Sequence, residues 1–305
     1  MNTQALPLRG ASGAWLLSPQ AGLVAATLLW SGNFVVGRAI RGEIEPLVLN
    51  FWRWAIAAAV LAPFVWRAFR QQLPTLRAHW AYVTLLGFTG LALPHTCSYY
   101  ALQSTSPVNA LLILMLMPVL VALAAWRLFG QAMVRLQWAG IASALLGAAW
   151  ILVRGDFDAL AQWRFSRGDL WMLPAVLGSS AHMLLLKRTP AGLTQGPLLL
   201  ASMVAAVLLL GAVLPWSFTG AELAVVAQVW PAALYVGVFA SAAAFFCWNR
   251  GVVRVGPARA APFMYLMPLY ASVLSVLFIG ETVQAYQAVG GALVLGGLWL
   301  ARERR

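Results

Sequence analysis

Apolar residues run along this chain in long stretches, separated by segments rich in Pro, Gly, Ser and charge. A hydrocarbon core about 30 Å thick needs ~20 apolar residues at ~1.5 Å per helical residue, so stretches of this length predict membrane-spanning helices. The pattern predicts ten spans, at residues 21–40, 46–66, 80–102, 107–127, 136–153, 169–186, 196–216, 230–250, 257–279 and 284–302. The connections are too short to hold a soluble domain. We therefore expect an all-α integral membrane protein.

The second half of the chain repeats the first. Residues 80–150, aligned without gaps on residues 230–300, share fifteen identical positions, several of them Pro, Gly, Trp or Cys. Such matches indicate a repeat more strongly than shared Leu or Ala in an apolar chain. Each copy holds five spans, and an odd number reverses the direction in which the second copy enters the membrane. The prediction is two inverted five-helix repeats around a central cavity, an arrangement of secondary transporters whose substrate binds between the halves.

The placement of charge predicts how the chain is oriented. The net charge of +12 alone would suit a nucleic-acid-binding protein, but 62% of the residues are hydrophobic and only 9% are charged. Fourteen of the twenty basic residues fall on the side that holds the N-terminus, five fall on the other side, and Arg53 lies within a span. The positive-inside rule then places both termini in the cytoplasm. We expect a multi-pass protein of the bacterial inner membrane that binds no nucleic acid.

These predictions divide the chain into five segments. They are a cytoplasmic leader (1–20), the first repeat (21–153), an external linker (154–168), the second repeat (169–302) and a cytoplasmic tail (303–305). Ten helices suffice for one transport pathway, so a monomer in the lipid bilayer is expected.

The chain lacks the motifs of a membrane-embedded enzyme. It has no Walker A loop, no His-Glu-x-x-His, no Gly-x-Ser-x-Gly and no pair of carboxylates on one helical face. Cys97 and Cys247 fall within spans, where a buried apolar role is the default. We expect no enzyme activity, no cofactor and no metal site, and a small molecule as the partner.

Polar side chains within spans are costly, so they need a partner or a wet cavity. Asn33 and His182 are predicted to line the cavity, with close helix packing as the alternative for the small residues beside them. His95 and Tyr99 lie one turn apart and form either a pocket or a histidine satisfied by a nearby carbonyl. Arg53 either holds a substrate carboxylate by a paired hydrogen bond or binds helix carbonyls, and the second role is favoured.

Aromatic side chains supply further candidates. Most of them are expected at the membrane interface or against lipid. Trp30, Tyr99, Tyr235, Trp248 and Tyr265 are the ones predicted in a cavity, where stacking would favour apolar or aromatic substrates.

Two prolines and three titratable residues are candidates for conformational change and coupling. Pro118 and Pro268 occupy equivalent positions of the two copies and would act as hinges or as static kinks. None of the eight acidic residues is predicted near a midplane, so proton coupling is either absent or uses His95 or His182. Glu281 is a weaker candidate because it ends a span.

The chain resembles the EamA-type branch of the drug/metabolite transporter superfamily. Both copies carry the resemblance, through Trp30-Ser31-Gly32-Asn33-Phe34, Arg53, Ala101-Leu102, Ala110, Pro118 and Gly130, then Gly168-Asp169-Leu170, Ala260, Pro268, Gly280-Glu281, Gln287, Gly290 and Gly297. The resemblance implies a ten-helix carrier with cytoplasmic ends, often an exporter of amino acids, other metabolites or toxic compounds. Gln131 departs from the Glu usual in the family, and Ser31-Gly32 reverses its commoner Gly-Ser.

The expected function is export of amino acids with aromatic or hydrophobic side chains, or of related neutral or zwitterionic compounds. A nucleotide-sugar or phosphate-ester exchanger would need several basic residues within spans, and only Arg53 lies well within one. That exchanger and a drug efflux carrier remain alternatives, and a static channel shares the same sequence signals.

Overall fold

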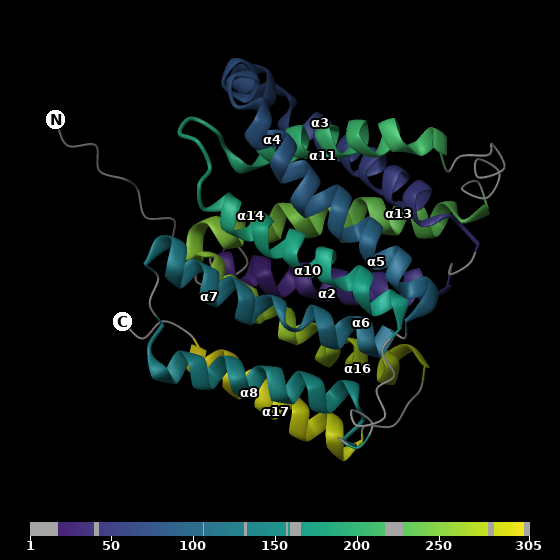
Figure 1. The fold of residues 1–305 in the computed structure, drawn as a ribbon, viewed down its shortest axis with the longest axis vertical. Coiled ribbons are helices and arrows are strands. Elements are labelled where there is room, and N and C mark those ends of the chain that lie inside the picture. Colours follow the sequence, from purple (N-terminus) through teal and green to yellow (C-terminus); the bar gives the residue numbers. More distant parts are fainter. Residues whose placement is uncertain are drawn as a thin grey trace, which may run out of the picture.

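The chain folds into a bundle of helices. The computed structural model describes residues 18–39, 43–105, 107–130, 133–156, 158, 166–216, 228–279 and 284–301. These residues contain helices and no strands. The helices lie side by side, with α8 and α17 at one edge and α3 and α11 at the other (Figure 1). The elements are α2 (Pro19–Ala39), α3 (Pro46–Ala78), α4 (Trp80–Gly87), η1 (Phe88–Ala92), α5 (Leu93–Ser104), α6 (Pro107–Leu114), α7 (Met117–Phe129), α8 (Arg135–Leu152), α10 (Arg167–Leu186), α11 (Gln195–Val213), η2 (Leu214–Trp216), α13 (Trp230–Gly237), η3 (Val238–Ala243), α14 (Ala244–Val255), α15 (Pro257–Ala260), η4 (Ala261–Tyr265), α16 (Leu266–Ile279) and α17 (Ala285–Ala301).

The helices have the length and apolar surface of an integral membrane protein. Within the described ranges, six are long and apolar enough to cross a membrane, namely Pro46–Ala78, Asn109–Phe129, Arg135–Leu152, Arg167–Leu186, Gln195–Val213 and Trp230–Val255. Many large apolar side chains on them are exposed, among them Leu177 and Leu208, as expected of surface that faces lipid. The all-α membrane class is thereby confirmed, and the count of ten spans stays a prediction.

Helix α3 is longer than the span predicted within it. The apolar stretch ends at residue 66, but the helix continues to Ala78. The hydropathy pattern marks where the chain leaves the hydrocarbon, whereas the helix continues because the following residues still favour helix. Pro63 and Pro74 lie inside the helix and do not end it.

Two π-helical segments occupy equivalent positions in the two halves. Residues 88–92 form η1 and residues 238–243 form η3, and they correspond under the shift of 150 residues. Each lies between two α-helical segments of one apolar stretch. A π-helical turn leaves backbone carbonyls out of the regular ladder, so they are free to accept other hydrogen bonds. The cavity described below uses these carbonyls.

Helices α8 and α17 are in backbone contact. A Cβ on Gly140 would lie 2.5 Å from the carbonyl oxygen of Gly297, and one on Gly147 would lie 2.6 Å from that of Gly290. The two contacts run in opposite sequence order, so the helices pack antiparallel. Only glycine permits backbones to approach this closely.

Both predicted hinge prolines follow an interruption of regular helix. Helix α6 ends at Leu114, and Pro118 lies in the first turn of α7. In the second half the 3-10 segment η4 precedes α16, whose first turn holds Pro268. Hinge motion at these two interruptions stays a prediction. Glu281, most of the leader and linker, and the tail lie outside the described residues.

Candidate functional site

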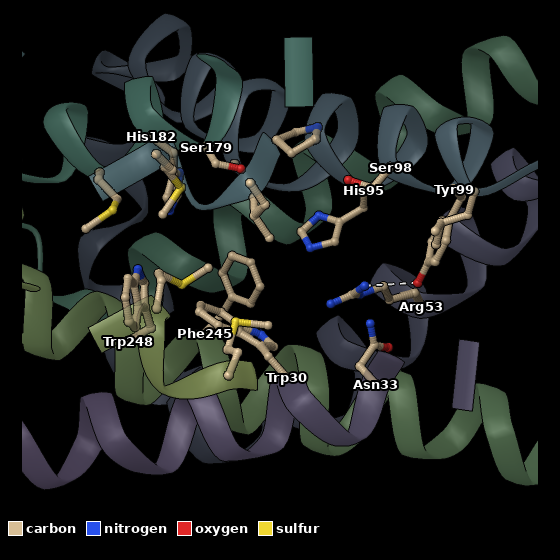
Figure 2. A pocket seen from close by; sticks show the side chains of 18 residues that line it. Trp30, Asn33, Arg53, His95, Ser98, Tyr99, Ser179, His182, Phe245 and Trp248 are labelled. Carbon is tan, nitrogen blue, oxygen red and sulfur yellow. Dashed lines mark hydrogen bonds between the residues drawn. The ribbon is translucent and has the colours of Figure 1, made fainter. Parts of the chain in front are cut away.

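A cavity opens between the two halves. Its space, the open side included, is about 950 Å³, within the usual size of a site for a small molecule. Side chains from α2, α3 and α5 of the first half meet those of α10, α14 and α16 of the second half around it (Figure 2). The lining residues are Trp30, Asn33, Arg53, Gly90, Pro94, His95, Ser98, Tyr99, Leu102, Leu114, Met117, Ser179, His182, Met183, Phe245, Trp248, Met264 and Met267.

Seven of the nine side chains predicted to bind substrate line this one cavity: Trp30, Asn33, Arg53, His95, Tyr99, His182 and Trp248. The other two are placed elsewhere. The Tyr235 hydroxyl donates to the carbonyl oxygen of Leu29 at 3.1 Å, and the Tyr265 hydroxyl donates to that of Met115 at 3.2 Å. Their phenol groups therefore join helices. The binding roles themselves remain predictions.

Arg53 is the cation of the cavity wall, and its side chain is 1% exposed. Its Nε donates to Ser241 Oγ at 2.6 Å, Nη1 to the Tyr99 hydroxyl at 3.0 Å and Nη2 to the Ala240 carbonyl at 3.2 Å. A guanidinium has five N–H groups, so two have no acceptor among the described residues. No carboxylate in those ranges pairs with it. Within the described ranges, the wall therefore holds a fixed positive charge without a paired carboxylate.

The π-helical segments hold the polar side chains of this region in place. The Ala240 carbonyl of η3 accepts from Trp30 Nε1 at 2.9 Å as well as from Arg53. In η1, the Leu91 carbonyl accepts from Trp54 Nε1 at 3.0 Å and lies 3.1 Å from His95 Nδ1. Backbone carbonyls of both π-helical segments thus bind side chains that line or support the cavity.

Asn33 lies at the Arg53 end of the cavity (Figure 2). Its Oδ1 is buried and has no hydrogen-bond donor in the part of the chain that the structure describes. An unpaired buried acceptor costs about 1–3 kcal/mol. A cationic or N–H group on a bound molecule would remove that cost, so this end offers both a donor set and an acceptor.

His182 lies at the opposite end of the cavity (Figure 2) and is 3% exposed. Its Nδ1 is 3.3 Å from the Leu86 carbonyl oxygen, and its Nε2 is 3.4 Å from Asn249 Oδ1. Helix α10 can approach η1 here because residue 90 is glycine, and a Cβ at that position would clash with the His182 ring. Asn249 is a polar residue inside an apolar stretch, a signal that the sequence analysis did not use.

Aromatic rings form the middle of the cavity. Trp30 contacts Phe245 and Trp248 with ring centroids 5.3 Å and 5.0 Å apart, and Phe245 also contacts His95 at 5.6 Å. Phe245 was missed because nothing in the sequence separates it from its apolar neighbours. Rings in such edge and tilted arrangements present a rigid apolar surface to a bound molecule.

Among the described residues no group of three or more His, Cys, Asp or Glu side chains is placed to hold a metal ion. The cavity thus offers binding chemistry: a cation, hydroxyls, an unpaired acceptor and apolar walls. Glu281 lies outside the described residues, so its predicted coupling role is untested.

Comparisons with known proteins identify the family of the chain. A model of the EamA-like transporter family matches residues 18–153 and 166–302. The chain is 25% identical to an uncharacterized transporter, YyaM, of Bacillus subtilis (strain 168), with 92% of each chain covered. It is 28% identical to a probable terminal-alkyne amino-acid exporter of Streptantibioticus cattleyicolor, also with 92% of each covered.

Two further proteins are similar over nearly the whole chain. A probable biotin transporter of Pseudomonas aeruginosa is 26% identical, over 93% of this chain and 97% of that protein. A protein of known crystal structure shares the fold with a TM-score of 0.74 at 22% identity, over 93% of this chain and 96% of that one.

Proposed function

Since the chain belongs to the EamA-like transporter family, we propose that it is a secondary transporter that exports amino acids with apolar or aromatic side chains across the bacterial inner membrane. Membrane transport follows from the family, and the similar named proteins are transporters, not enzymes. The cargo and the direction are the added proposal.

The buried charge of Arg53 carries the choice of cargo. A cation in a low-dielectric wall is costly without a counter-charge, and three of its five N–H groups have acceptors among the described residues, which leaves two for the oxygens of a bound carboxylate. The sequence analysis favoured a structural role for Arg53. The three bonds that orient it support a binding role, because they leave part of the guanidinium available.

The named cargoes of two similar proteins are compatible with this chemistry. One is a probable terminal-alkyne amino-acid exporter and the other a probable biotin transporter. An amino acid and biotin both carry a carboxylate. The phosphate-ester alternative is less favoured, since Arg53 is the one cation among the lining residues.

We propose that the chain forms ten spans in two inverted repeats, 21–153 and 169–302, joined by an external linker at 154–168. The α8–α17 contact supports this arrangement. Gly140 is equivalent to Gly290, and Gly147 is equivalent to Gly297, because each pair is 150 positions apart. Exchanging equivalents turns the contact of Gly140 with Gly297 into the contact of Gly290 with Gly147, and both contacts are present. Two antiparallel helices that exchange in this way are related by a two-fold axis perpendicular to both, as inverted repeats require.

The proposed transport mechanism assigns the polar end of the cavity to the cargo's amino-acid group. Arg53 and Tyr99 bind its carboxylate, and Asn33 Oδ1 accepts from its ammonium group. The aromatic middle, with Trp30, receives the side chain. Coupling, where present, runs through His95 or His182, and Pro118 and Pro268 are the hinges.

The test is counterflow of labelled amino acids, aromatic ones first, in liposomes that hold the purified protein. Wild type should show saturable exchange, and Arg53→Gln should lose it. Arg53→Lys keeps the charge but not the planar donor pair, so it should raise KM. Arg67→Gln is the control, because Arg67 is an exposed arginine of the same helix. Equal exchange by folded Arg53→Gln and Arg67→Gln would refute the carboxylate role.

A further inference from the structure

We infer that the transporter accepts several amino acids of different apolar side-chain shape, because the part of the cavity away from Arg53 is built from methionines. The inference rests on the proposed function and adds the range of cargo to it.

Methionine is concentrated in the cavity. Four of the chain's nine methionines are among its lining residues, Met117, Met183, Met264 and Met267. They are 1–7% exposed and belong to one apolar cluster with Trp248. Met115, Met133, Met172 and Met203 are not lining residues.

The methionines and the charged group occupy different parts of the cavity. In Figure 2 the sulfur atoms, drawn in yellow, lie in the half bounded by His182, Trp248 and Phe245, and Arg53 lies in the other half. They come from both repeats: Met117 of α7 belongs to the first, and the other three, on α10, η4 and α16, belong to the second. Cargo held at Arg53 by its carboxylate would extend its side chain into this methionine half.

The methionine half and the Arg53 half of the cavity differ in how firmly their shape is fixed. Arg53 is oriented by three hydrogen bonds, so the carboxylate end is rigid. A methionine side chain is unbranched, has three rotatable bonds and a polarizable sulfur, and adapts to apolar groups of different shape. A rigid polar end with an adaptable apolar end selects for the amino-acid group and tolerates linear aliphatic, thioether and aromatic side chains. Charged side chains are disfavoured, because Arg53 is the one Lys, Arg, Asp or Glu among the lining residues and it lies in the other half.

A competing role for these methionines is in the motion of the helices. Met117 and Met267 are direct neighbours of Pro118 and Pro268, where regular helix is interrupted. Flexible side chains there would ease a hinge motion, and their loss would slow the transport of every cargo by a similar factor. The experiment therefore has to compare cargoes with one another.

The experiment replaces all four cavity methionines by leucine, which is similar in volume but branched and stiffer. The control replaces Met115, Met133, Met172 and Met203 by leucine. Counterflow of L-norleucine, L-methionine, L-phenylalanine and L-tryptophan is measured for wild type and both variants, after thermal unfolding shows that each is folded. KM for the four amino acids should lie within about tenfold in wild type and control, and should spread by a further factor of about ten in the cavity variant.

Three results would overturn the inference. Exchange of a single amino acid by wild type would do so and would leave the proposed function standing. Equal slowing of all four in the cavity variant would assign the methionines to motion. No exchange of any carboxylate by folded wild type would overturn the proposed function and this inference together.

Discussion

At Arg53, the arrangement of neighbouring groups matters as much as the charge. Ser241 comes from the other half of the chain and accepts from Nε at 2.6 Å, and the Tyr99 hydroxyl accepts from Nη1 at 3.0 Å. Both hold the guanidinium in place in the cavity wall. Ser241 is therefore a positioning residue, and removing its hydroxyl should affect binding of a carboxylate more than the transport step.

We predict that Ser241→Ala raises KM for amino-acid cargo about tenfold and changes the maximal rate little. A hydrogen bond to a charged group is worth about 1.5–3 kcal/mol, and 1.4 kcal/mol is a factor of ten. Ser202→Ala is the matched control, since this buried serine bonds only within its own helix, to the Leu198 carbonyl at 2.9 Å. Counterflow kinetics of the two variants decide the question, and an unchanged KM for Ser241→Ala would contradict the positioning role.

The sequence could identify polar residues within apolar stretches but not their partners. Asn33, Arg53, His95 and His182 were singled out because polar groups in a membrane are costly. Ser241 and Asn249 were not singled out. Each matters through its contact with a residue far away in sequence, Arg53 for Ser241 and His182 for Asn249. Phe245 and the four methionines lacked any polar signal at all.

Among the elements, the π-helical segments have the most direct effect on the site. They supply the carbonyls of Leu91 and Ala240 to side chains that line or support the cavity. They could not be predicted, because a π-helical turn changes the helical period only locally, and a uniformly apolar stretch does not reveal its period. Hydropathy depends on composition, so the all-α membrane class could be predicted, whereas the ten spans stay a prediction.

The close contact of α8 and α17 predicts opposite effects of the same substitution at neighbouring positions. A Cβ on Gly297 would lie 2.5 Å from the Gly140 carbonyl oxygen, whereas one on Gly296 would meet nothing within 4 Å. Gly297→Ala should destabilise the protein by about 1–3 kcal/mol, and Gly296→Ala should be neutral or stabilising by up to about 1 kcal/mol. Thermal unfolding in detergent measures both, and a stable Gly297→Ala protein would argue against backbone contact.

The whole molecule should have both termini in the cytoplasm, as the distribution of basic residues predicts. A green fluorescent protein fused to the C-terminus should fluoresce in cells, and alkaline phosphatase at the same point should be inactive. Fusions within residues 189–194 are expected to give the same result, and fusions within 159–165 or within 217–227 the opposite one. An active phosphatase at the C-terminus would reverse the orientation.

Coupling to a proton gradient also belongs to the whole molecule. We predict that replacing both His95 and His182 by Gln abolishes uptake driven by a pH difference but retains counterflow at equal pH, with a raised KM because both side chains line the cavity. The single replacements serve as controls that identify which histidine matters. Full pH-driven uptake in the double variant would exclude the histidines as coupling groups.

The hydrogen bond of the Tyr265 hydroxyl affects the relative stability of the two conformations expected of inverted repeats. It donates to the carbonyl of Met115, the residue equivalent to Tyr265 itself in the other half. When inverted repeats exchange conformations, each contact is replaced by the contact between the two equivalent residues. The equivalent of this hydrogen bond would need a hydroxyl on Met115, and methionine has none. One of the two exchanged states is therefore favoured by about 1 kcal/mol, a population ratio of roughly five. Under the proposed inverted-repeat arrangement, this one hydrogen bond gives the transporter a built-in preference for facing one side of the membrane.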